Sequence, residues 1–110
     1  MGLTMFTGGI NWGAIGTGNT APTVTDSQLT TEFARSGLSF YQDTNFNEAQ
    51  VQFFFSDAVL TNQTYYEFGT FIAGTSAANS GQIFNHALFT SPYGKSAGTD
   101  TTVEVDITLT

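Results

Sequence analysis

The chain is organised around the stretch INWGAIGTGNTAPTVTDSQLTTEFAR, residues 10–35. Its first six residues, 10–15, form an apolar run that predicts a strand. Two glycines and a proline within residues 16–22 then predict a loop, because these residues favour turns over regular structure. The opening of this stretch therefore indicates a strand that enters a tight turn.

The second half of the stretch predicts one short helix near residues 26–34. Thr25 and Gln28 fit the first and last positions of a capping box, which satisfies free amides at a helix start. Leu29 and Phe33 are four residues apart, so both would face the core from such a helix. The helix would have only about two turns, which is marginal without tertiary contacts.

From residue 33 onwards the apolar residues recur at every second position, which is the period of a strand. Strands are expected at residues 33–42, 50–58, 64–72, 82–90 and 101–109. Short turns join them, and no second helical pattern follows. We therefore expect an all-β fold: a single antiparallel β-sandwich of about six to eight strands over residues 10–110. Residues 1–9 are expected to form an N-terminal arm.

Composition and charge exclude several classes of function. The chain of 110 residues has a net charge of −7, with nine acidic residues and only two basic ones. Nucleic acids and anionic membranes are bound mainly through Lys and Arg, so neither is expected as a partner. The sequence contains no cysteine, which rules out disulfides and thiolate metal sites, and no cofactor is expected. Aromatic residues make up 15% and charged residues only 10% of the chain, a balance that suits permanent protein contacts or sugar binding.

The motifs that could carry chemistry are weak. Gly16-Thr17-Gly18 lacks the third glycine and the long helix of a dinucleotide loop, and it lacks the Gly-Lys-Ser/Thr of a P-loop, so a structural turn is expected. His86 is the single histidine and no nucleophile motif accompanies it, so it is expected at a surface or interface position in its strand. We therefore expect a protein that is not an enzyme, with no catalytic residue and no metal ligand.

The acidic residues are dispersed and match no calcium-binding loop. Any two of them could form the catalytic carboxylate pair of a glycosidase, so the sequence gives only weak support for that function. Glu104 and Asp106 share one strand face, where they could meet solvent, a basic partner or, less readily, a calcium ion.

Arg35 is one of only two cations in an acidic chain, so it should clamp a carboxylate. Glu32 and Glu67 are the candidates. We favour an Arg35–Glu67 salt bridge that ties the opening stretch to the strand at residues 64–72.

The aromatic residues of two strands suggest an interface between subunits. Phe53, Phe54 and Phe55 are consecutive, and in a strand they cannot all point into one core. With Tyr65 and Tyr66 they form the candidate interface set. A rival interpretation is a carbohydrate-binding module, in which exposed aromatic rings would stack on sugars; its candidate rings are Trp12, Tyr41, Tyr65 and Tyr93.

Five motifs in this order resemble a family of small tail-associated structural proteins of tailed bacteriophages. They are AIGTGNTAP at residues 14–22, TDSQL at 25–29, EFAR at 32–35, EFGTF at 67–71 and TVEVDITL at 102–109. The match covers about residues 10–110, which is nearly the whole chain. Two features depart from the pattern: residues 1–9 stand where the family often has an amphipathic helix, and His86 stands where it often has Arg.

The resemblance implies a non-enzymatic β-sandwich within a phage virion, assembled in the bacterial cytoplasm. It implies a place in the tail, as part of a fibre, collar or tip, with capsid decoration as an alternative. The partners would be other virion proteins and copies of the chain itself, as a homo-oligomer. Recognition of a host-surface glycan is the alternative from another functional class.

Overall fold

The computed structural model describes residues 10–23, 25–45 and 48–108, and this part of the chain is all-β. Its strands are β1 (Ile10–Gly16), β2 (Glu32–Asn45), β3 (Glu48–Phe55), β4 (Thr64–Ile72), β5 (Gln82–Gly94) and β6 (Thr101–Thr108). The predicted all-β class is thus confirmed, and a strand lies in each of the expected regions. The described residues include no helix that could cross a membrane.

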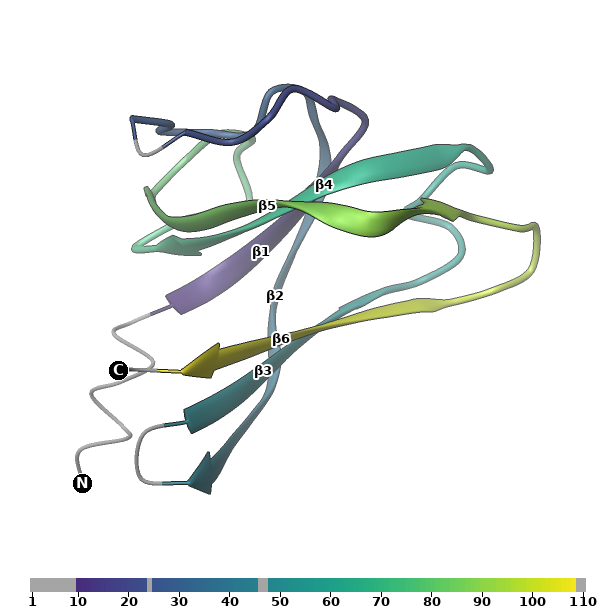
Figure 1. Cartoon of the computed structure of the whole chain (residues 1–110). Helices are drawn as coiled ribbons and strands as arrows, with labels where there is room; N and C mark the ends of the chain where they lie inside the picture. Colours follow the sequence, from purple (N-terminus) through teal and green to yellow (C-terminus); the bar gives the residue numbers. More distant parts are fainter. Residues whose placement is uncertain (1–9, 24, 46–47, 109–110) are drawn as a thin grey trace.

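The six strands form one curled antiparallel sheet in the order β5-β4-β1-β2-β3-β6 (Figure 1). Strand β2 produces the curl because it changes partner along its length. Its first half, from Glu32 to Gly37, pairs with β1, and its second half, from Leu38 onwards, pairs with β3. The finer prediction of a two-sheet sandwich is therefore not confirmed.

The inner face of the curled sheet holds the main core. Phe53 and Phe68 pack at its centre with ring centroids 5.6 Å apart, and Ile15 and Val51 are completely buried beside them. Gly13 leaves the space for this contact, since a Cβ there would lie 2.6 Å from the Phe53 ring. The close approach of β1 to the two aromatic rings therefore requires glycine.

The loop of residues 17–31, which the structure describes apart from residue 24, covers part of the outer face, above β1, β4 and β5 (Figure 1). Leu29 is buried there against Ala14 and Phe71 in a second, smaller cluster, so its expected core position is confirmed. The helix predicted near residues 26–34 is wrong, because this segment remains a loop until β2 begins. Phe33 consequently lies on a strand and is 40% exposed rather than in the core.

The candidate interface set divides into core and surface residues. Alternation along β3 buries Phe53 and Phe55 and leaves Phe54 46% exposed. Tyr65 is completely buried, whereas Tyr66 is half-buried. Phe53, Phe55 and Tyr65 are therefore core residues in this chain, which corrects their assignment to an interface and leaves Phe54 as the exposed member of the phenylalanine triplet.

Candidate functional site

One buried carboxylate, that of Glu67 on β4, organises the loop of residues 17–31. The side chain of Glu67 is completely buried. It accepts hydrogen bonds from the backbone N–H groups of Gly18 at 2.9 Å, Thr30 at 2.8 Å and Thr31 at 2.7 Å. Hydrogen bonds to an ionised acceptor are about twice as strong as neutral ones. Because the amides come from both ends of the loop, a single side chain fixes both ends to the sheet.

The Gly-Thr-Gly motif, which ends β1 and begins the loop, lets the backbone reach this carboxylate. A Cβ on Gly16 would lie 2.5 Å from the Oε2 atom of Glu67, and one on Gly18 would lie 2.7 Å from it. Real Cβ atoms do not approach an oxygen so closely, so any side chain here would displace the carboxylate. The two glycines are therefore needed for close backbone approach.

His86 on β5 extends the cluster by bridging two carboxylates. Its Nε2 atom lies 2.7 Å from Oε1 of Glu67, and its Nδ1 atom lies 2.8 Å from Oδ2 of Asp26. Each ring nitrogen therefore lies within hydrogen-bond distance of one carboxylate oxygen, with the donor and acceptor roles set by the tautomer of the ring. The side chain of His86 is only 4% exposed. The expectation of a surface or interface histidine is therefore corrected: β5 places it beside Glu67 and under the loop.

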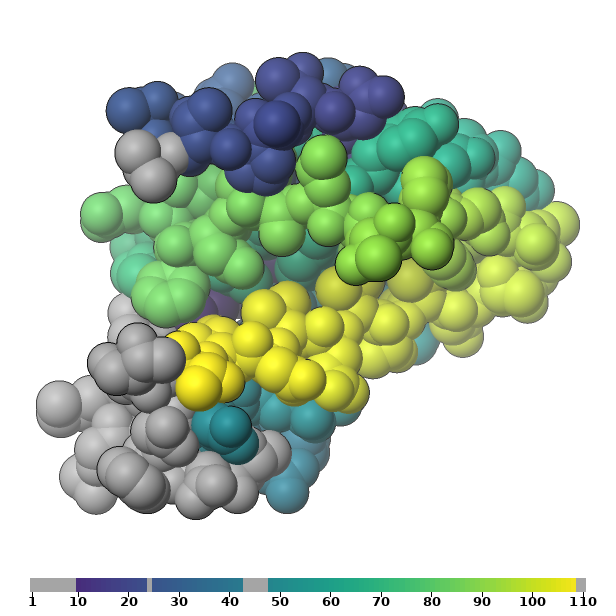
Figure 2. All heavy atoms as spheres, in the orientation of Figure 1, coloured from purple at the N-terminus to yellow at the C-terminus, as the bar shows by residue number. Residues whose placement is uncertain are grey.

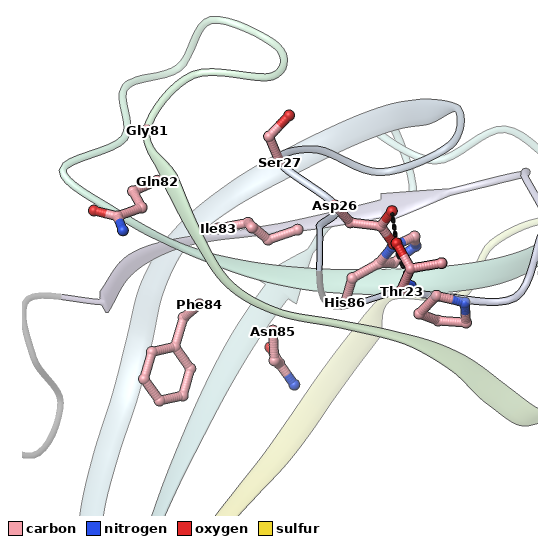
Figure 3. Close-up of a pocket in the computed structure, with 10 residues that line it drawn as sticks. Thr23, Asp26, Ser27, Gly81, Gln82, Ile83, Phe84, Asn85 and His86 are labelled. Atoms are coloured by element: carbon pink, nitrogen blue, oxygen red, sulfur yellow. Dashed lines mark hydrogen bonds and ion pairs between the residues drawn. The ribbon is translucent and has the colours of Figure 1, made fainter.

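A cavity of about 740 Å³ adjoins this cluster (Figure 3). Asp26 and Thr23 from the loop form one wall, and the first residues of β5 form the other. In Figure 3 the side chains of Asp26 and His86 point towards each other, whereas Phe84 and Asn85 point to the opposite side of β5. The polar atoms of the cluster already serve one another as partners, so the arrangement is suited to holding the loop on the sheet.

The pKa of Asp26 is lowered from its ordinary value. The largest cause is the hydrogen bond donated by the backbone N–H of Thr23, and the hydrogen bond from His86 adds to it. Both interactions favour the carboxylate over the protonated acid. Asp26 therefore remains ionised in the folded chain at pH values where an unfolded aspartate has begun to take up a proton.

We expect this depressed pKa to make the loop sensitive to acid. The stabilisation by Asp26 is complete above the unfolded aspartate value of about 3.9 and is lost as the pH falls through the lower folded-state pKa. Asp26→Asn should lose less stability on acidification than the native chain. Urea unfolding at a series of pH values from 7 downwards measures this.

Glu104→Gln, which changes an exposed acid, serves as the matched control and should keep the native acid slope. Part of that slope should persist in Asp26→Asn, because a hydrogen bond from Lys95 also lowers the pKa of Asp57. An Asp26→Asn variant with the full native slope would contradict the role given to Asp26.

Arg35 pairs with Glu32 and not with the favoured candidate, Glu67. Its guanidinium donates to both oxygens of Glu32, at 2.7 and 2.9 Å, lies 4.6 Å from the centre of the Phe71 ring, and donates to the backbone oxygens of Thr75 and Ser80. The predicted Arg35–Glu67 salt bridge is therefore wrong, because Arg35 pairs with Glu32. Glu67 ties the opening stretch to β4 through three backbone amides of the loop instead.

Lys95, the second cation, is also used inside the fold. Its side chain is completely buried, and its ammonium group forms an ion pair with Asp57. It also donates to the backbone oxygen of Ser96 at 2.9 Å. Both basic residues of the sequence, Arg35 and Lys95, are therefore neutralised internally, so neither presents a free positive charge at the surface.

The outer face of β2, β3 and β6 carries exposed phenylalanines beside a polar ladder. Phe40 is 43% exposed and pairs across the strands with Gln52, two residues before Phe54 on β3. Further along the same face Gln50 donates a hydrogen bond of 2.9 Å to Glu104. In the described part of the chain, the loop of residues 17–31 lies over the other half of the sheet, so it leaves these side chains uncovered.

The Asp26–His86–Glu67 cluster is the feature that sequence reasoning missed. Its one visible signal was the acid Glu67 within the aromatic segment TYYEFGTFI, because a carboxylate in a buried strand needs donors. Nothing local indicated that His86 and the loop would supply them. Within the described ranges, no group of three His, Asp or Glu side chains is placed to bind a metal ion. Comparison with protein-family models, curated proteins and solved structures finds no match to this chain.

Proposed function

We propose that this chain is a non-enzymatic structural subunit of a tailed-phage virion, located in the tail as part of a fibre, collar or tip. It acts through contacts with copies of itself and with other virion proteins. The resemblance of its five ordered motifs supports the class of protein. The exposed pair Phe40 and Phe54 on a strand face that no described element covers is the observation that supports a contact role.

The two phenylalanines are suited to a subunit contact because their burial would be strongly favourable. Full burial of a phenylalanine side chain contributes about 1.5–3 kcal/mol relative to its exposed state. Aromatic residues at the centre of an interface commonly dominate its free energy. The neighbouring Gln50, Gln52 and Glu104 would form a polar rim of the kind that surrounds such centres.

The sugar-binding alternative finds less support in the aromatic rings named for it. Tyr65 is completely buried. Tyr41 and Tyr93 pack against the main core, and Trp12 packs against the second cluster. Stacking on sugars needs rings displayed on an open surface. These four rings are instead buried or packed against core residues.

The location of the chain in purified phage particles tests the proposal. Antibodies against the chain should label the tail of intact virions. The mass of the virion component that contains the chain should correspond to several copies of it. Labelling of the head would replace the tail assignment by the capsid-decoration alternative. Purified particles that lack the chain would overturn the virion role altogether.

We expect the double variant Phe40→Ser/Phe54→Ser to weaken self-association of the purified chain about 30-fold or more, since interface centres contribute about 2 kcal/mol or more. Sedimentation equilibrium over a range of concentrations measures the change. Val59→Ser removes a similarly exposed apolar side chain, 47% exposed on a turn, and should leave association unchanged. If the native chain stays monomeric at every concentration, the proposed homo-oligomer is contradicted.

A further inference from the structure

The two end strands of the sheet, β5 and β6, border a groove whose backbone edges are not paired to each other. In the described part of the chain they stand at opposite ends of the strand order. The curl brings them to one face of the molecule, with a furrow between them (Figure 2). Two cavities of about 360 and 220 Å³ lie along this line, each lined by residues of both strands. We name this groove the β5–β6 seam.

The floor and rim of the seam differ in character. Phe68, Phe89, Val103 and Val105 line it and belong to the main core or pack against it. Glu104 and Asp106 alternate with the valines along β6 and also line the seam; both are exposed. A strand laid along β6 would therefore meet apolar side chains on its inward face and carboxylates on its outward face.

The strand directions fix how one further strand could enter. Every neighbouring pair in the sheet is antiparallel, so β5 and β6 run in opposite directions. A single inserted strand would be antiparallel to one edge and parallel to the other, and its backbone could bond to both. Addition of a strand to a free edge is a common mode of peptide recognition, in which main-chain hydrogen bonds give affinity and alternate side chains give specificity.

The negative charges on β6 determine which kind of segment could bind in the seam. A second copy of this chain would bring like charges against Glu104 and Asp106, and directly opposed like charges are destabilising in a sheet. It could not offset them, because the only two cations of the chain, Arg35 and Lys95, already form internal ion pairs. The seam is therefore suited to a partner of different sequence that carries positive charge.

We propose that the β5–β6 seam binds an extended segment of another protein in which apolar residues alternate with Lys or Arg. Its apolar side chains fill the groove above Phe89 and Val103, and its cations lie beside Glu104 and Asp106. The inserted segment closes the curled sheet. This inference rests on the proposed assembly role and names the chemistry of one partner strand within it.

A synthetic peptide of eight residues, alternating Lys and Val and capped at both ends, tests the proposal with the full chain. We expect the peptide to bind, and to perturb and protect backbone amides of β5 and β6 in nuclear magnetic resonance spectra. The same peptide with N-methyl groups on alternate residues keeps its charge and side chains but cannot bond along one edge. It should bind at least tenfold more weakly, because strand addition depends on main-chain hydrogen bonds.

Variants of the chain distinguish binding in the seam from general attraction of a cationic peptide to an acidic protein. Glu104→Gln/Asp106→Asn should weaken binding of the Lys-Val peptide about fivefold to tenfold, in line with two cross-strand charge pairs. Asp100→Asn, in the turn before β6, should leave it unchanged. Equal binding of the N-methylated peptide, perturbation away from β5 and β6, or no binding would each overturn the seam proposal. Virion labelling tests the assembly role separately, so failure of one can be told from failure of the other.

Discussion

Glu67→Gln is expected to lower the free energy of unfolding by about 3–5 kcal/mol, the cost of removing one partner from a buried charged cluster. Three backbone amides donate to the native carboxylate, and Nε2 of His86 lies 2.7 Å from it. The glutamine amide has one acceptor oxygen, and its NH₂ group would face donors that need acceptors. Such a loss is a large fraction of the about 5–15 kcal/mol by which domains are stable.

Denaturant unfolding followed by tryptophan fluorescence or circular dichroism measures this effect. Glu104→Gln makes the same chemical change on an exposed strand face and should stay within about 0.5 kcal/mol of the native chain. A double-mutant cycle with His86→Gln should reveal coupling between the two positions, because they share a hydrogen bond. A Glu67→Gln variant as stable as the Glu104→Gln control would show that the cluster does not hold the loop.

Phe53→Ala is expected to be the second severe change, with a loss of about 3–5 kcal/mol from the cavity that a deleted core phenylalanine leaves. Phe53 is completely buried and contacts Phe68 in the centre of the inner face. Gly13 packs on the same ring from β1, so no side chain there can move in to fill the space. Both halves of the curled sheet would lose contacts at once.

The neighbouring variant Phe54→Ala provides the matched comparison, because it deletes the same side chain one residue along β3. Phe54 lies on the outer face and is 46% exposed, so its removal should cost well under about 1 kcal/mol in the isolated chain. Urea midpoints of the two variants give the contrast directly. Similar losses from both would mean that the alternation of β3 is not the one described.

The strands were predictable because their signal is local. Alternation such as Val103, Val105 and Ile107 on one side of β6 depends only on the pleat of the backbone, and it placed all the strand regions correctly. The glycine turn after β1 could be anticipated in the same way. The helix near residues 26–34 could not be rejected locally, since Thr25, Gln28 and Leu29 do satisfy its pattern. The helix does not form because Glu67 accepts hydrogen bonds from the amides of Thr30 and Thr31, which are 37 and 36 residues away in the sequence.

By itself the sequence determined the all-β class, the strand positions, the acidic charge with only two cations, and the impossibility of burying three consecutive phenylalanines on one face. The tertiary structure alone decided which ionisable groups meet. The strand order sets β4 between β5 and β1, and this order brings His86, Glu67 and the loop into one cluster while Arg35 turns to Glu32. The curl likewise brought β5 and β6, the two end strands, to one face of the molecule. Contacts between residues far apart in the chain depend on how the strands are ordered and folded over, and no local pattern records that order.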